Sequence, residues 1–220
     1  MERNTNQTRA RLLEAARSLF WEKGYAATGM AELLERGQAN SGSFYHFFAS
    51  KEALLLAVLD SHIEGLEPIV LRPAFARHRD PILRIFALLA GYRERILGTG
   101  CRYGCPLGRL ALEIEPENLP AHQRIADNFS GWISAVRKCL QQAREQGRLA
   151  PNLDLDALAT FVLTTMEGGV MQSRSYRSVK PFDQSVAQLR SYFAYLITKP
   201  ARVKIHRRGR SSTKKKGNLK

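Results

Sequence analysis

The sequence is poor in cysteine and contains no long uninterrupted hydrophobic run. Its 220 residues include three cysteines, which are Cys101, Cys105 and Cys139. An odd and sparse set cannot form the disulfide framework of a small secreted protein, so we expect free thiols in a reducing compartment. The most apolar stretches are broken by Arg84 or Thr164 before they reach the length of a membrane span, and the first residues show no apolar signal region. We therefore expect a cytoplasmic protein with no membrane partner.

Acidic residues are absent from the end of the chain. The formal net charge is +14, and nine Lys or Arg residues lie in 201–220 without one Asp or Glu, which leaves +5 for the rest. Because this segment is also rich in Gly and Ser and nearly free of apolar residues, we expect residues 200–220 to be a basic, disordered tail. The tail either adds sequence-independent attraction to phosphate or is a solvated terminus without a dedicated role.

A period-two alternation of apolar residues, the sign of a half-buried strand, is also missing. Between Gly and Pro residues the apolar side chains instead recur at intervals of three and four, which is typical of amphipathic helices. A hydrophobic content of 44% over 220 residues is enough for a real core. The sequence therefore predicts an all-α fold.

The first 52 residues contain signals for short, capped helices. A first helix is predicted from about Asn6 to a C-terminal glycine cap at Gly24. Thr28 is expected to be the N-cap of a short second helix that ends at Gly37, and Asn40 the N-cap of a third. Two short helices joined by a tight glycine-containing turn form a helix-turn-helix, so this region is predicted to be a three-helix head.

Longer helices are predicted after the head. One begins after the N-cap Ser50, and Pro68 and Pro73 are expected to end or kink it. A further helix opens at Pro81, and others are expected over residues 121–146, 155–171 and 181–197. A glycine-rich break separates these helices over residues 98–108.

The segment from Thr28 to Phe48, with the residues after it, resembles the signature of the TetR family of transcriptional regulators. In that signature a capped short helix and a turn precede a helix of the form Ser-x-Gly-x-Leu-Tyr-x-x-Phe, and Lys-Glu with a leucine-rich helix follow. Here the chain reads Asn40-Ser-Gly-Ser-Phe-Tyr-His-Phe-Phe48 and then Ser50-Lys-Glu-Ala-Leu-Leu. The match covers about residues 8–60, and residues 104–113 resemble one subgroup of the family.

The resemblance implies a function as well as a fold. It implies a sequence-specific DNA-binding regulator, a homodimeric repressor on a palindromic operator that a small-molecule effector releases, with neither cofactor nor enzymatic activity. Residues 1–52 would then be the helix-turn-helix DNA-binding domain, and residues 53–199 the helical ligand-binding and dimerisation domain. The alternatives are a non-specific basic DNA-binding protein, or a thiol-based sensor or enzyme that uses Cys105.

Candidate DNA contacts gather at the start of the third predicted helix. A recognition helix enters the major groove by its N-terminal end, so small or polar residues are expected outward there, while Phe44 and Phe48 share an inward face. The family pattern assigns Tyr45, Thr28 and Lys51 to contacts with the DNA backbone. The candidates are Thr28, Asn40, Ser41, Gly42, Ser43, Tyr45, His46 and Lys51. The alternative is that Thr28, Asn40 and Ser50 are only caps and Tyr45 an ordinary half-buried aromatic.

Two positions depart from the family pattern. The turn carries Gln38-Ala39 where the family usually has Gly-Val, which puts the turn geometry in question. Phe47 stands where a phosphate-contacting His or Tyr is common, so that contact is either absent or moved to His46. Without an Arg or Gln in the outward N-terminal half of the helix, we expect DNA shape to contribute much of the specificity.

Candidate effector contacts are apolar and aromatic residues of the second domain, because small-molecule sites are mostly apolar with few polar anchors. They are Phe86, Leu89, Tyr92, Tyr103, Cys105, Leu107, Leu110, Ile125, Phe129, Trp132, Phe161 and Met166. The alternative is plain core, and we expect fewer than half to touch a ligand. Cys105 lies near Arg102 and Arg109, which predicts either a lowered thiol pKa or an inert small residue. The Cys-x3-Cys spacing does not match a usual zinc site, so no metal is expected.

The resemblance places a dimer interface on the last two long helices. Apolar and small residues there suit close helix packing, although each is equally compatible with a core position. They are Phe161, Val162, Met166, Gly168, Gly169, Val170, Val186, Leu189, Tyr192, Phe193 and Leu196.

Overall fold

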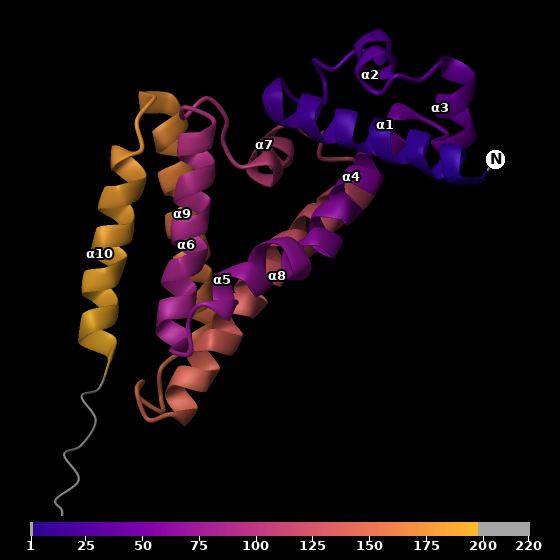
Figure 1. Ribbon diagram of the computed structural model, residues 1–220. Coiled ribbons are helices and arrows are strands. Elements are labelled where there is room, and N and C mark those ends of the chain that lie inside the picture. Colours follow the sequence, from indigo (N-terminus) through magenta and orange to yellow (C-terminus); the bar gives the residue numbers. More distant parts are fainter. Residues whose placement is uncertain (1, 198–220) are drawn as a thin grey trace, which may run out of the picture.

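The computed structural model describes residues 2–197 and the side chains of residues 6–197, and this part of the chain is helical throughout (Figure 1). In chain order the elements are α1 (Glu2–Glu22), α2 (Met30–Arg36), α3 (Ser41–Phe47), α4 (Lys51–Gly65), the π-helix η1 (Leu66–Leu71), α5 (Arg72–Ala76), α6 (Pro81–Gly98), α7 (Pro106–Glu113), α8 (Leu119–Glu145), α9 (Leu155–Tyr176) and α10 (Lys180–Leu196). An isolated antiparallel bridge joins Leu149 and Ile197. The predicted all-α fold is confirmed. The predicted basic tail, residues 200–220, lies outside the described residues.

Helices α1, α2 and α3 form a head at one end of the molecule (Figure 1). Their shared core consists of fully buried side chains such as Leu12, Leu19, Leu33 and Phe44. Gly24, with φ +97°, ends α1 in the left-handed conformation predicted for a glycine cap. Helices α2 and α3 are held by packing against α1, since their seven residues each are too few for a stable isolated helix.

Two of the three predicted N-caps are confirmed and one is wrong. The Asn40 Oδ1 accepts a hydrogen bond from the Ser43 amide at 2.8 Å, and the Ser50 Oγ accepts one from the Ala53 amide at 3.0 Å. Helix α2 instead begins after Gly29, without a side-chain cap. Thr28 is buried, and its hydroxyl donates to the Gly24 carbonyl at 2.6 Å, so it closes the turn before α2 rather than capping the helix.

The chain kinks after α4 without leaving the helical state. Pro68 lies within η1 and Pro73 at the second position of α5, where a proline is tolerated. A proline has no amide hydrogen to donate to the helix ladder. At Pro68 the chain has π-helical hydrogen bonding instead of α-helical hydrogen bonding. The predicted domain boundary at residues 52 and 53 falls in the first turn of α4, so one helix crosses it.

The second domain packs around α8. Helices α4, α6 and α9 lie against α8, and α10 pairs with α9. In Figure 1, α4 and α8 run through the middle of the molecule between the head and the α6, α9 and α10 end. The predicted break over residues 98–108 is shorter than expected, because α7 begins at Pro106 and the Cys105 sulfur accepts its first-turn hydrogen bond from the Gly108 amide at 3.4 Å.

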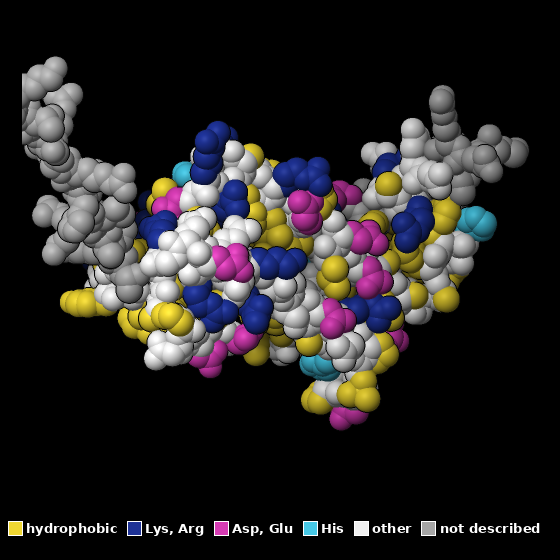
Figure 2. Space-filling model, turned by 90° about the horizontal axis from the view of Figure 1, so that it is seen from below, with side chains coloured by type: hydrophobic (Ala, Val, Ile, Leu, Met, Phe, Trp, Pro, Cys, Tyr) yellow, Lys and Arg dark blue, Asp and Glu magenta, His cyan; other side chains and the backbone are white. Residues whose placement is uncertain are grey.

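The predicted dimer residues divide into two groups. The buried group favours the core alternative and consists of Val162, Met166, Gly169, Val170, Leu189 and Phe193. The accessible group consists of the exposed Phe161 and Tyr192 and the half-buried Gly168, Val186 and Leu196. Further exposed large hydrophobic side chains of α9 and α10, not predicted, are Met171, Tyr176 and Tyr195. Figure 2 shows hydrophobic side chains at the α10 end of the molecule, whereas Lys or Arg and Asp or Glu side chains alternate across the middle of that face.

Within residues 2–197, none of the helices has the combination of length and apolar character needed to cross a membrane.

Candidate functional site

The outward face of α3 is small and polar. Ser41, Gly42, Tyr45 and His46 are exposed, with 61% of the Tyr45 side-chain surface accessible, and Ser43 is half-buried. A Cβ added at Gly42 would have only the Asn40 Oδ1 as a near neighbour, at 3.4 Å, so nothing hinders a close approach of the backbone to another molecule.

The inward face of α3 is aromatic. Phe44 is fully buried and Phe48 nearly so, with ring centroids 5.8 Å apart, and the Tyr45 ring meets the edge of Phe44. This packing fixes the rotation of α3 about its axis, so the polar face points away from the head. The division predicted from the sequence is confirmed.

The turn before α3 keeps its geometry despite the missing glycine. Gln38 takes the left-handed conformation with φ +49°, which a non-glycine residue adopts at some cost. The Arg11 guanidinium spans the turn, with Nε donating to the Gly37 carbonyl at 3.3 Å and an Nη donating to the Gln38 carbonyl at 3.5 Å. Ala39 is half-buried and packs against the core. Helix α1, through Arg11, therefore holds the turn that positions α3.

Two candidate phosphate contacts are already engaged inside the protein. Thr28 is 1% exposed and its hydroxyl is bonded to Gly24, so the predicted DNA contact through this side chain is wrong for the structure. The Lys51 Nζ donates to the Tyr25 carbonyl at 2.6 Å and lies 4.3 Å from the centroid of the Tyr25 ring. Burial lowers the pKa of Lys51. Two of its three N–H groups are left for a partner outside the protein.

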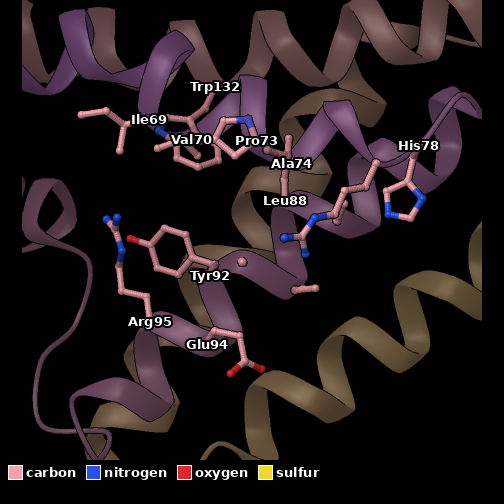
Figure 3. Close-up of a pocket in the computed structure, with 14 residues that line it drawn as sticks. Ile69, Val70, Pro73, Ala74, His78, Leu88, Tyr92, Glu94, Arg95 and Trp132 are labelled. Atoms are coloured by element: carbon pink, nitrogen blue, oxygen red, sulfur yellow. The ribbon is translucent and has the colours of Figure 1, made fainter.

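The second domain contains an apolar cavity of about 420 Å³ between η1, α5, α6 and α8 (Figure 3). Of the predicted effector residues, Tyr92 and Trp132 line it. The remaining lining residues were not indicated by the sequence patterns. They are Ile69, Val70, Pro73, Ala74, Arg77, His78, Ala87, Leu88, Ala90, Gly91, Glu94 and Arg95.

A second, smaller cavity of about 50 Å³ adjoins the first, because Val70, Tyr92, Arg95 and Trp132 line both. Its walls contain more of the predicted residues, together with polar side chains that the patterns did not indicate. The predicted members are Tyr92, Cys105, Leu107, Phe129, Trp132 and Met166, and the additional polar members are His62, Arg95, Asn128 and Glu167.

Three polar side chains of this inner cavity interact with one another. Cys105 interacts electrostatically with both Tyr92 and Glu167. Burial raises the pKa of each, to about 12 for the Cys105 thiol. The predicted lowering of the Cys105 pKa is therefore wrong, because desolvation and the neighbouring Glu167 carboxyl outweigh the arginines nearby in sequence. Burial, with Arg17 and Arg95, also lowers the pKa of His62 to about 4, so this imidazole is neutral at pH 7.

The other predicted effector residues do not line these two cavities, which favours the alternative of a core or surface position for them. Phe86 and Leu89 line a separate cavity of about 250 Å³ between α6 and α10. Tyr103 packs on Trp21 with centroids 5.1 Å apart, and Phe161 is exposed beside Tyr192. Leu110 and Ile125 are buried core residues. A further open groove of about 580 Å³, between α7, α8 and α9, includes Cys105 and Phe129.

Helix α7 and the loop before it contact the head directly. The Trp21 Nε1 donates to the Gly104 carbonyl at 2.7 Å, and the Glu113 Oε1 accepts from the Ala26 amide at 2.7 Å. The Arg109 guanidinium donates to the Lys23 carbonyl. Because Cys105 and Leu107 of the inner cavity belong to the same segment, α7 connects a cavity wall to the head.

Within residues 2–197, no cluster of three or more His, Cys, Asp or Glu side chains is arranged to hold a metal ion.

Comparisons with known proteins agree with this architecture. Residues 12–58 match the family model for bacterial regulatory proteins of the tetR family, and residues 81–189 match the tetracyclin repressor-like C-terminal domain. The chain is 26% identical over 176 residues to the HTH-type transcriptional repressor DhaR of Mycobacterium sp. (strain GP1), covering 80% of this chain and 87% of DhaR. It is 26% identical over 196 residues to the HTH-type transcriptional repressor NemR of Escherichia coli (strain K12), covering 86% and 95%.

A solved structure shows the same fold. A TetR transcriptional regulator from Chloroflexus aurantiacus superposes with a TM-score of 0.77 at 26% identity, covering 89% of this chain and 98% of that one. With both halves matched, the chain belongs to the TetR family of DNA-binding transcriptional regulators and is not an enzyme.

Proposed function

We propose that this regulator is a repressor that binds a palindromic operator as a homodimer in the cytoplasm and is released from it by a small-molecule effector. The observation that carries the proposal is a polar face of α3, fixed outward by Phe44 and Phe48, on a head joined to a domain with a partly open cavity. The names of DhaR and NemR, both transcriptional repressors, support the sign of regulation.

The proposed DNA contacts are the accessible side chains of α3 and its cap. Ser41, Ser43 and His46 suit base edges or phosphate, Gly42 permits close approach, and the Tyr45 hydroxyl suits a phosphate oxygen. Asn40 and Lys51 lie at the N-termini of α3 and α4, where backbone amides favour anions. Since none of these side chains is a long base-reading Arg or Gln, DNA shape supplies part of the specificity.

Two paths connect the cavity to the head. Helix α4 packs against α1 and continues through η1 into α5, whose residues line the 420 Å³ cavity. Helix α7 lines the inner cavity and contacts the backbone of residues 23–26. A ligand that favours a different position of η1 or α7 therefore favours a different position of the head, which is release by population shift.

Dimerisation is assigned to the exposed face of α9 and α10. Phe161 and Tyr192 meet edge to face, with centroids 5.8 Å apart, and both are about half exposed. An apolar face of this kind suits a two-fold contact with a second copy, which would present two heads to successive major grooves about 34 Å apart.

The test is an operator selected from random DNA by the purified protein, followed by footprinting and measurement of the mass of the complex. We expect two half-sites related by a dyad and two or a multiple of two chains. Tyr45→Ala should weaken operator binding, whereas Lys138→Ala, which removes an exposed cation of α8, should not. A monomer that shows no preference over bulk competitor DNA would instead support the non-specific basic DNA-binding alternative. An unchanged salt dependence after removal of residues 201–220 would exclude a contribution of the tail.

A thiol-based sensor using Cys105 is the second candidate. The sequence environment suggested it, but the buried thiol with its pKa raised to about 12 is a poor nucleophile in this conformation. The cavity therefore favours a non-covalent effector.

A further inference from the structure

The 420 Å³ cavity has an unbalanced positive charge. Arg77 and Arg95 both line it and are both exposed, and neither has an ion-pair partner among residues 6–197. Glu94, the acidic residue of the lining, contacts the Arg93 guanidinium at 3.4 Å. The cavity thus offers two guanidinium groups to an anion, and its carboxylate already has a cationic neighbour.

The rest of the lining is apolar and aromatic. Trp132 and Tyr92 meet edge to face with centroids 6.1 Å apart, and Val70 and Leu88 add aliphatic surface. Figure 3 shows Trp132, Ile69 and Val70 gathered on one side and Arg95 extended beside the Tyr92 ring, with its guanidinium near the phenol hydroxyl. An aromatic surface beside a guanidinium is suited to a ligand with an apolar body and an anionic end.

The deeper side of the site contains one carboxyl group, that of Glu167, whose pKa is raised by burial. Tyr92 and Cys105 beside it are buried and protonated at pH 7. Selection by charge therefore falls to the exposed arginines, and selection by shape to Trp132 and Tyr92.

We propose that this cavity binds a small amphipathic carboxylate, with the apolar body against Trp132 and Tyr92 and the carboxylate paired with Arg95, while Arg77 adds positive charge to the same lining. The proposal names the chemical class of the effector and rests on the proposed function. A guanidinium pairs with a carboxylate through two parallel N–H···O hydrogen bonds. An alcohol has only one oxygen and cannot form this pair, and an ammonium group is repelled by the guanidinium. The ligand would lie against η1 and α5, the segment that continues α4.

The experiment compares three probes with one apolar body: 4-phenylbutyrate, 4-phenylbutanol and 4-phenylbutylamine. Trp21 and Trp132 are the two tryptophans of the chain, so the Trp21→Phe variant reports the cavity through Trp132 fluorescence. Isothermal titration calorimetry of the unmodified protein gives the affinities. We expect the carboxylate to bind about tenfold more tightly than the alcohol and the amine to bind most weakly.

Arg95→Gln should weaken 4-phenylbutyrate binding by about three- to tenfold and Arg77→Gln should weaken it less, and both variants should leave 4-phenylbutanol binding within about twofold. The matched control is Arg79→Gln, an exposed arginine two residues from Arg77 that does not line the cavity. Because all three arginines are exposed, thermal unfolding should be unchanged. Equal binding of the three probes, no saturable binding of any, or equal losses in all three variants would overturn the proposal.

Release of operator DNA, measured by fluorescence anisotropy in the same samples, separates this proposal from the proposed function. If 4-phenylbutyrate binds with the expected arginine dependence but leaves the operator bound, the carboxylate site stands and release by this site fails. If another compound releases the operator and 4-phenylbutyrate does not bind, the repressor function stands and the carboxylate site is overturned.

Discussion

The head and the second domain bury their polar side chains differently. In the head, polar side chains bond to the backbone: Thr28 to the Gly24 carbonyl, Asn40 to the Ser43 amide and Lys51 to the Tyr25 carbonyl. In the second domain, Asn128 also bonds to backbone carbonyls, those of Leu59 and Arg124, but Tyr92, Cys105 and Glu167 interact with one another beside a cavity.

This difference indicates that the DNA-binding head is rigid and that the cavity of the second domain can adapt to a ligand. A hydrogen bond to the backbone is lost only when the local fold changes, so the head presents one geometry to DNA. Side chains that satisfy one another around a cavity can exchange partners with a ligand at small cost, because each has other donors or acceptors within reach.

The largest effect is expected from the core of the head. Phe44→Ala removes a fully buried ring on which the orientation of α3 depends, and it should lower the free energy of unfolding by about 3–5 kcal/mol and abolish operator binding. Urea unfolding and fluorescence anisotropy measure the two effects. Leu112→Ala, at an 87% exposed leucine of α7, is the control and should change stability by less than about 0.5 kcal/mol. Unchanged stability and unchanged operator binding in Phe44→Ala would show that the orientation of α3 does not depend on this ring.

The buried thiol should react slowly. With the Cys105 pKa raised to about 12, iodoacetamide at pH 8 should alkylate it about a thousandfold more slowly in the folded protein than in urea, because few molecules carry the thiolate. Peptide mass spectrometry resolves it from Cys139, whose pKa burial raises to about 11 and which should also be protected. Folded-state alkylation of Cys105 within tenfold of the unfolded rate would revive the thiol-sensor alternative.

His62 should make the second domain sensitive to acid. Its pKa in the folded protein, about 4, is below the ordinary value of 6.5, so the unfolded chain binds the proton more tightly. The stabilisation is complete above pH 6.5 and is lost as the pH falls towards 4, with a loss of about 2 kcal/mol by pH 4.5. Urea unfolding at pH 7 and pH 4.5 should show this loss in the wild type and a smaller one in His62→Gln. Parallel losses in both proteins would contradict the assignment.

The smallest effect concerns a single hydroxyl on the reading face. Tyr45→Phe should weaken operator binding by about 1 kcal/mol, or about fivefold, without changing stability, because the side chain is largely exposed. Ser134→Ala removes the hydroxyl of an exposed serine on α8, away from the head and from the α9 and α10 face, and is the control. Equal operator affinity of the two variants would remove Tyr45 from the proposed contacts.

The head was predictable from the sequence because its signals are local. Asn40 and Ser50 cap the helices that begin directly after them, Gly24 ends α1, and the four-residue spacing of Phe44 and Phe48 gives the inward face of α3. The cap assigned to Thr28 failed because its hydroxyl found a backbone carbonyl four residues earlier, a choice that only the folded turn decides.

The cavity was less predictable because its walls come from distant segments. Tyr92 and Trp132 were expected as aromatic residues, but Arg77, Arg95 and Glu167 carry no periodic signal that distinguishes them from solvated surface charges. Phe86, Leu110 and Phe161 had the same apolar pattern and lie elsewhere. The pKa of Cys105 was also not predictable from its neighbours in the sequence. Desolvation by packing raises this pKa, and the arginines close in sequence do not outweigh it.

The contacts between α7 and the head have a consequence for protein engineering. Arg109 and Glu113 bind the carbonyl of residue 23 and the amide of residue 26, groups that every amino acid except a proline amide supplies. Gly24 is the exception, since a Cβ there would lie 2.4 Å from a Glu113 oxygen. The remaining contact needs a side chain of the head, since Trp21 donates to the Gly104 carbonyl. A foreign reading head with glycine and tryptophan at these two positions should therefore dock onto this sensor domain in the same way, which would make the chain a starting point for hybrid biosensors.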